Sequence, residues 1–228
     1  AVSVLLKAGV DVGILGDKER CCGNPSLRMG DMDSFVAFAK ENVKQFNEMG
    51  IEKLVTLCPF CYSTFVRDYP DTGEKPNYEV IHILPLVLDM IKEGKLKLTK
   101  PINIDATYHD PCHLVRLGGA GISGTDDFDG IHREPRAIID AIPGINFVEM
   151  YRKRESAWCC GAGSWQRHGY LEMAQWTADQ RIKEAEAVGA ETMITFCPHC
   201  EENLTEAAER RGNGMEVKDL LELVLESL

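Results

Sequence analysis

Two stretches, LVTLCPFCYSTF (residues 54–65) and MITFCPHCEENL (residues 193–204), each place an apolar, β-branched run directly before a Cys-Pro-x-Cys box. The apolar run is typical of a buried strand, and the proline falls in the first turn of a following helix, where its missing N–H costs little. A strand that leads into Cys-Pro-x-Cys can serve a redox dithiol, a zinc site or an iron–sulfur site. The surrounding sequence discriminates among these three.

The two boxes belong to an internal repeat. Each repeat opens on Cys-Cys-Gly, at residues 21–23 and 159–161, and continues into an amphipathic helical pattern that stops at Gly50 or Gly189. Between the paired cysteines and the box lie 35 residues in the first repeat and 36 in the second. The cysteines of the two repeats therefore have nearly the same spacing.

Strand and helix patterns alternate along the chain, which is typical of an α/β fold. We predict two pseudo-repeated lobes, residues 1–100 and 101–228, each a small, mainly parallel sheet flanked by helices. A glycine-rich stretch at 118–127 is predicted to be a loop. Besides the strands that precede the boxes, we predict strands at 10–15, 78–83, 102–108 and 145–150, and a helix at 84–93.

Composition narrows the class of protein. The chain has 228 residues and a net charge of -11, which argues against a nucleic-acid partner. Its second half carries 12 basic and 22 acidic side chains and so holds most of the excess. No apolar run is long enough to predict a membrane span, and the first residues do not resemble a signal peptide. Nine cysteines is a high and odd number, which makes disulfides the weaker explanation.

All nine cysteines fall within the repeat, at positions 21, 22, 58 and 61 and at positions 112, 159, 160, 197 and 200. A dithiol would leave the paired cysteines idle, because adjacent Cα atoms are about 3.8 Å apart and ordinary disulfides need roughly 4.4 Å. A structural zinc site closes at four ligands, whereas the second repeat offers five thiols. Adjacent cysteines also suit two different metal ions better than one. The pattern favours iron–sulfur chemistry, with zinc as the alternative.

The second repeat resembles the cysteine-rich CCG domain of heterodisulfide reductases, found in their B-type and D-type chains and in related quinone-linked proteins. The resemblance rests on Cys112, the Cys159-Cys160-Gly161 motif, the box at 197–200, and the motifs YHDPCHL and WCCGAGS, and it covers essentially the whole chain. It implies a noncubane [4Fe-4S] cluster held by five thiolates, in which the paired cysteines bind different irons. In that family two such clusters face each other, and a disulfide is cleaved between them in one-electron steps.

The first repeat departs from this pattern, because it has no counterpart of Cys112. We expect that cysteine upstream of residue 1, in a longer chain, and then Cys21, Cys22, Cys58 and Cys61 would join it around a second noncubane cluster. Without it, four cysteines suffice for a cubane [4Fe-4S] cluster or for zinc. A second departure is the 46 residues between Cys112 and Cys159, a long gap that the glycine-rich loop accounts for.

Two histidines next to predicted ligands, His113 and His199, are candidate proton donors to a leaving thiolate. The sequence thus predicts an iron–sulfur oxidoreductase subunit that acts on a small thiol or disulfide. The alternative is an electron-relay subunit of a quinone- or flavoprotein-linked complex. Either needs redox partners: a flavin subunit, a ferredoxin-like subunit or a membrane cytochrome. We expect such oxygen-sensitive clusters in the cytoplasm, or at the cytoplasmic face of a membrane complex.

Overall fold

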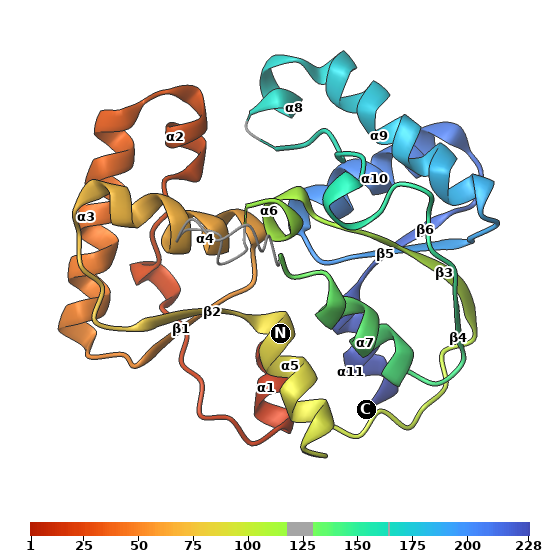
Figure 1. Cartoon of the computed structure of the whole chain (residues 1–228), viewed down its shortest axis with the longest axis horizontal. Helices are drawn as coiled ribbons and strands as arrows, with labels where there is room; N and C mark the ends of the chain where they lie inside the picture. The colour runs from red at the N-terminus through yellow and green to blue at the C-terminus, as the bar shows by residue number, and fades with distance from the viewer. Residues whose placement is uncertain (118–129, 164) are drawn as a thin grey trace.

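The chain folds into an α/β structure with two parallel sheets, each flanked by helices (Figure 1). The structure is a computed structural model and describes residues 1–117, 130–163 and 165–228. Every strand pair in these residues is parallel, as predicted for a fold in which helices connect the strands. The predicted fold class of two lobes is confirmed.

The first lobe is built on a two-stranded sheet. Strand β1 (Lys53–Thr56) pairs with β2 (Glu79–His82). The helices of this lobe are α1 (Val2–Lys7), α2 (Asn24–Met29), α3 (Met32–Met49), α4 (Pro59–Ser63) and α5 (Ile83–Lys92). Helix α3 ends at Gly50, which takes the left-handed conformation expected of a C-terminal cap.

The second lobe is built on a four-stranded sheet with the order β4-β3-β5-β6. The strands are β3 (Ile104–His109), β4 (Ile145–Phe147), β5 (Thr192–Thr195) and β6 (Glu216–Asp219). The helices are α6 (Cys112–Val115), α7 (Arg133–Ala141), α8 (Gln166–Gly169), α9 (Leu171–Ala187), α10 (Pro198–Arg211) and α11 (Leu220–Ser227). Helices α9 and α10 pack against each other (Figure 1).

Strand β6 and helix α11 extend the repeat beyond the cysteines. Residues 215–224 (MEVKDLLELV) match residues 78–87 (YEVIHILPLV), and both segments form a short strand that turns directly into a helix. His82 caps α5 and Asp219 caps α11, each by accepting a hydrogen bond from a backbone N–H two residues further on. The sequence prediction missed β6, although this second copy of the motif was the signal for it.

The prediction of a strand at residues 10–15 is wrong. This segment is irregular and ends in a short 3-10 turn at Gly16–Lys18. Val10 and Val12 pack against the core, whereas Ile14 is 77% exposed. A strand needs a neighbour to pair with its backbone, and no strand in the described residues pairs with this one. The predicted loop at 118–127 lies outside the described residues.

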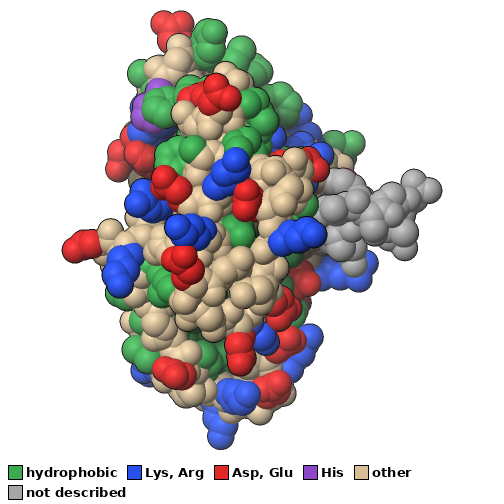
Figure 2. Space-filling view, turned by 90° about the vertical axis from the view of Figure 1, so that its left-hand side faces the viewer, with side chains coloured by type: hydrophobic (Ala, Val, Ile, Leu, Met, Phe, Trp, Pro, Cys, Tyr) green, Lys and Arg blue, Asp and Glu red, His purple; other side chains and the backbone are tan. Residues whose placement is uncertain are grey.

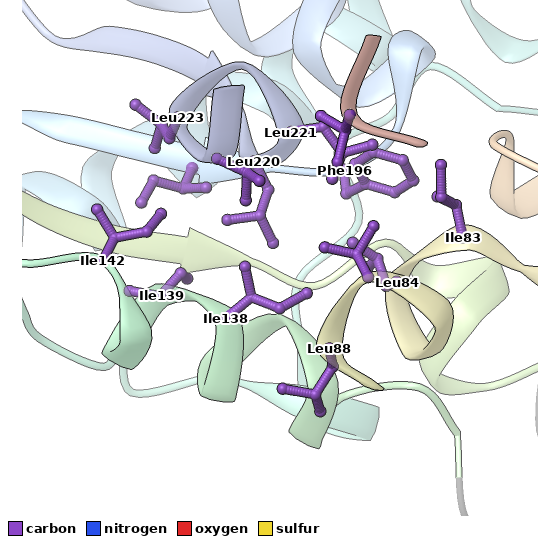
Figure 3. Close-up of a cluster of buried hydrophobic side chains, with 14 of the residues drawn as sticks. Ile83, Leu84, Leu88, Ile138, Ile139, Ile142, Phe196, Leu220, Leu221 and Leu223 are labelled. Carbon is purple, nitrogen blue, oxygen red and sulfur yellow. The ribbon is translucent and has the colours of Figure 1, made fainter. Parts of the chain in front are cut away.

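The largest apolar core lies below both sheets and joins the two lobes. Helices α5, α7 and α11 meet there, and Phe196 at the end of β5 packs onto them (Figure 3). Ile83 and Leu84 come from the first lobe, whereas Ile138 and Leu220 come from the second, and all four are fully buried. Each such side chain stabilises the fold by about 1.5–3 kcal/mol. The boundary between residues 100 and 101 stays a prediction.

The outer face of the first lobe carries mixed charge. Figure 2 shows basic and acidic side chains interspersed on this face, with no continuous basic stripe. Residues 1–100 hold 13 basic and 14 acidic side chains, so the two signs nearly balance. A nucleic-acid surface would concentrate Lys and Arg on one face, and this face does not do so.

Candidate metal centre

The cysteine boxes lie at the carboxyl ends of the parallel strands. Strand β1 runs into Cys58, β3 into Cys112 and β5 into Cys197. In open parallel sheets, side chains that follow neighbouring strands meet at this edge. Because β3 and β5 are adjacent in the second sheet, Cys112 and the box at Cys197–Cys200 emerge side by side. The helices α4 and α10 begin at the prolines of the two boxes, as predicted.

The glycine of each Cys-Cys-Gly motif has a positive φ, and Gly161 in addition lies very close to the backbone of α9. Gly23 has φ +79° and Gly161 has φ +85°, a region that side chains other than glycine adopt at a cost. A Cβ atom on Gly161 would lie 2.6 Å from the carbonyl oxygen of Ala174 in α9. In both motifs the glycine N–H donates to the Sγ of the first cysteine, at 3.4 Å to Cys21 and 3.3 Å to Cys159. The two loops are thus built alike.

The four first-lobe cysteines converge. Cys22 accepts hydrogen bonds from the thiols of Cys21 and Cys61, which lowers the pKa of Cys22 to about 3 and raises the pKa values of both donors. The Cys61 thiol also lowers the pKa of Cys58. The thiolate is the form of cysteine that binds metal, so this set holds two groups already biased toward that form.

The five second-lobe cysteines also converge and are more deeply buried. Cys159 accepts hydrogen bonds from Cys112 and Cys160, which lowers the pKa of Cys159 to about 2 and raises the pKa values of the two donors. The thiol of Cys200 contacts those of Cys160 and Cys197, and its pKa is raised by these contacts and by burial. Cys160, Cys197 and Cys200 are each 3% exposed or less. Sequence spacing predicted this grouping of five cysteines.

Three buried polar side chains hold the paired cysteines in place, and sequence reasoning missed them. Asn42 donates to the carbonyl oxygen of Cys21 and Tyr69 to that of Cys22, at 2.9 and 3.0 Å. Asn203 donates to the carbonyl oxygen of Cys160 at 2.6 Å. Both asparagines are fully buried on helices that otherwise bury apolar residues. A polar residue on an apolar helix face was the available signal.

A buried ion pair fixes the segment between β3 and Cys112. The Asp110 side chain is fully buried and receives two hydrogen bonds from the Arg136 guanidinium, at 2.8 and 2.9 Å. Arg136 also donates to Glu149 and to the carbonyl oxygen of His132. The backbone N–H of Arg154 donates to Asp110 at 2.7 Å, which ties the chain before the second Cys-Cys-Gly motif to the same carboxylate. Asp110 therefore connects the segment before Cys112 with the segment before Cys159.

The two predicted proton donors occupy different environments. His113 is buried, its Nδ1 lies 2.8 Å from the Ser63 hydroxyl, and burial followed by the charge of Arg28 lowers its pKa to about 4. His199 is exposed. The Phe60 ring contacts both imidazoles, with ring centroids 4.0 Å from that of His113 and 5.2 Å from that of His199. Phe60 comes from the first box and belongs to the buried cluster that includes the second-lobe cysteines Cys160, Cys197 and Cys200.

A cleft of about 590 Å³ opens between the lobes. All four first-lobe cysteines line it, whereas no second-lobe cysteine does so among the described residues. His199, Trp165 and Arg167 form part of its opposite wall. A separate hollow of about 650 Å³ lies along α3 and is lined by residues such as Lys40 and Glu48, without a thiol. The cleft therefore gives small molecules access to the first-lobe thiols.

The chain matches the cysteine-rich CCG domain over residues 1–66 and 106–205. It belongs to this CCG family. The match covers both lobes and includes the nine cysteines. The donor set fits an iron–sulfur group, because only thiols converge in the first lobe and five thiols converge in the second.

Among the relatives is the D-type chain of the dihydromethanophenazine:CoB–CoM heterodisulfide reductase of Methanosarcina mazei, 37% identical over 99% of this chain and 53% of the relative. The B-type chain of the fumarate reductase (CoM/CoB) of Methanothermobacter marburgensis is 32% identical over 97% of this chain and 41% of the relative. EtfAB:quinone oxidoreductase of Syntrophomonas wolfei is 32% identical over 87% of this chain and 27% of the relative. The chain thus spans about half, or less, of the length of the curated relatives it matches.

None of the helices described is long and apolar enough to cross a bilayer.

Proposed function

We propose that this chain is an iron–sulfur oxidoreductase subunit that reduces or forms a small disulfide. The observation that carries the proposal is the convergence of two groups of thiols, one per lobe, of which the first lines a cleft open to small molecules. Relatives whose names include heterodisulfide reductase and fumarate reductase (CoM/CoB) support it.

The second lobe would hold a noncubane [4Fe-4S] cluster through its five cysteines. If a further part of the protein supplies a fifth cysteine, the first lobe would hold a second noncubane cluster through Cys21, Cys22, Cys58 and Cys61; with these four thiols alone it would hold a cubane cluster or zinc. When bound, such clusters supply single electrons and iron atoms that can take a substrate thiolate. The buried asparagines and the Asp110–Arg136 pair orient the ligand loops.

A disulfide substrate would enter the cleft and come beside the first-lobe thiols. Its reduction consumes two electrons and two protons and gives two thiols. His199 lines this cleft and is the proposed donor of a proton to a leaving thiolate. His113 is the second proposed donor; its ring contacts Phe60, and its Nδ1 lies 2.8 Å from the Ser63 hydroxyl.

The electrons would come from outside these 228 residues, which contain neither a flavin-binding fingerprint nor a ferredoxin-type run of cysteines. A flavin subunit, a ferredoxin-like subunit or a membrane cytochrome fits this role. We place the assembly in the cytoplasm or at the cytoplasmic face of a membrane complex, because reduced iron–sulfur clusters of this kind need protection from oxygen.

The second candidate is an electron relay without a disulfide substrate. Two observations favour it: none of the second-lobe cysteines is among the described residues that line the cleft, and one relative is named a quinone oxidoreductase. In this version the cleft would receive a partner or remain a solvent-filled groove, and electrons would cross between the two clusters.

The test is the iron, acid-labile sulfide and zinc content of the full-length protein purified without oxygen. Two clusters give about eight irons per chain, and one cluster gives about four. Cys58→Ser and Cys197→Ser, at matched positions of the two boxes, should each remove the cluster of one lobe. An EPR signal of the oxidised protein that changes on addition of a thiol supports disulfide chemistry, and an unchanged signal supports the relay. Zinc without iron refutes both.

A further inference from the structure

His109 is the last residue of β3, and the sequence prediction did not single it out. One of its ring nitrogens lies within 4.8 Å of the Sγ atoms of Cys160 and Cys200, and these two sulfurs lie within the same distance of each other. All three residues are buried, and His109 is 1% exposed. Within the residues that the structure describes, His109 is the histidine that could share a metal site with these two second-lobe cysteines.

A buried arginine decides which ring nitrogen carries the proton. The Arg181 Nε–H donates to His109 Nδ1 at 3.0 Å. Arginine has no lone pair to offer, so Nδ1 must be the acceptor and the single proton of the neutral ring sits on Nε2. Arg181 is itself held by the carbonyl oxygen of Arg152 at 2.8 Å and by Glu184 at 2.7 Å. The tautomer is thus fixed by side chains outside the thiol group.

His109 Nε2 is buried and has no hydrogen-bond partner among the described residues. A buried N–H without an acceptor loses its hydration and gains nothing in return, so its retention calls for an acceptor at this position. Candidate acceptors lie close to the ring, since the sulfurs of Cys160 and Cys200 are within 4.8 Å of one of its nitrogens. Because Nε2 carries a proton, it can donate a hydrogen bond but cannot serve as a metal ligand.

We infer that His109 is a positioning residue that donates an N–H hydrogen bond to a ligand sulfur of the second-lobe cluster and thereby raises the reduction potential of that cluster. The inference rests on the proposed function. A donor to a thiolate stabilises the reduced, more negative state relative to the oxidised one, and hydrogen bonds to sulfur are among the factors that set such potentials.

His82 provides a matched control. It ends β2, is also buried, and sits directly before a helix, but both of its ring nitrogens are occupied: Nε2 lies 3.2 Å from the carbonyl oxygen of Leu57, and Nδ1 accepts from the N–H of Leu84. His82→Phe removes an imidazole of the same burial without removing a donor to sulfur.

The experiment compares His109→Phe, His109→Gln and His82→Phe with the wild type in the iron-loaded full-length protein. Iron content is measured first, and EPR-monitored redox titration follows. His109→Phe should lower the equilibrium constant for reduction of the second-lobe cluster about tenfold, which is 59 mV for one electron. His109→Gln, which keeps an N–H, should recover part of the shift, and His82→Phe should not move the potential.

A spectroscopic readout separates hydrogen bonding from packing. Electron-nuclear double resonance should detect an exchangeable proton coupled to the cluster in the wild type and in His109→Gln, and this signal should be lost in His109→Phe. Iron-loaded variants with unshifted potentials and an unchanged proton signal would overturn the inference while leaving the proposed function intact. A wild-type protein without iron would overturn both.

Discussion

Replacement of Arg136 by methionine should destabilise the fold more than replacement of any exposed arginine. Arg136 makes two hydrogen bonds to Asp110, two to Glu149 and one to the carbonyl oxygen of His132. Burial opposes its charge, yet these bonds raise the pKa of Arg136 above its ordinary value. Methionine fills a similar volume but leaves the Asp110 carboxylate buried, and among the residues the structure describes its remaining partner is the N–H of Arg154.

The expected magnitude follows from the exposure of the partners. The Asp110 side chain is 0% exposed, whereas that of Glu149 is 24% exposed and can be partly rehydrated. Removal of one partner from a buried ion pair costs about 3–5 kcal/mol, and Asp110 accounts for most of it here. For a chain of this length the loss corresponds to about 6–20 °C in melting temperature.

The assay is urea unfolding followed by far-ultraviolet circular dichroism, with Arg20→Met as the control. Arg20 pairs with Glu41 on the surface, where both side chains are more than half exposed, so its loss should cost less than about 1 kcal/mol. Addition of Asp110→Asn to Arg136→Met should bring the combined loss about 1–3 kcal/mol below the sum of the two single losses. Strict additivity, or an Arg136→Met loss no larger than that of Arg20→Met, would refute the role assigned to the pair.

Three further predictions concern other parts of the fold. Burial lowers the pKa of His82 to about 3, whereas the unfolded chain takes up the proton near pH 6.5, so the free energy of unfolding falls as pH drops below about 6.5. In urea titrations the wild type should lose about 2 kcal/mol more than His82→Phe between pH 7 and pH 5. Equal losses would contradict this. Gly161→Ala should lower the melting temperature more than Gly189→Ala does. Both alanines must take a positive φ, which costs about 1–2 kcal/mol, but only the alanine at 161 would also clash with backbone atoms. Equal melting temperatures would count against the close approach at Gly161. Asn203→Ala should lower the free energy of unfolding by about 1–3 kcal/mol and reduce iron retention in the second lobe; unchanged retention would mean that its bond to Cys160 does not support the ligand loop.

Much of this architecture could be predicted from local signals. The boxes marked the strand ends, because a β-branched run followed by Cys-Pro-x-Cys gives both the strand and the helix start at once. The repeat placed the cysteines in two groups, because equal spacing in homologous units places equivalent residues at equivalent points of the fold. The strand predicted at 10–15 failed because strand formation depends on a pairing partner, which an apolar pattern alone does not supply.

The supports of the centre were beyond local prediction. Arg181 meets His109 across 72 positions of the chain, and Asn203 meets the carbonyl oxygen of Cys160 across 43. Nothing within one helical turn of these residues indicates such partners. A buried polar residue on an apolar helix face predicts that some partner exists. The partner is identified only by the packing of α10 against α9 and β6 and by the contact of Arg181 in α9 with the end of β3.

The contact between the lobes determines how the two thiol groups can work together. Phe60 belongs to the first box, yet its ring contacts His113 and His199 of the second lobe, and a Cβ on Gly163 would lie 2.7 Å from it. Ser63, one turn further along the same helix, reaches His113 next to Cys112. The first box is therefore anchored in the second lobe by its own side chains, and the shared core beneath it excludes a free hinge. Clusters held at these positions would keep a fixed separation, so changes at the mouth of the cleft should alter substrate access without altering electron transfer between the lobes.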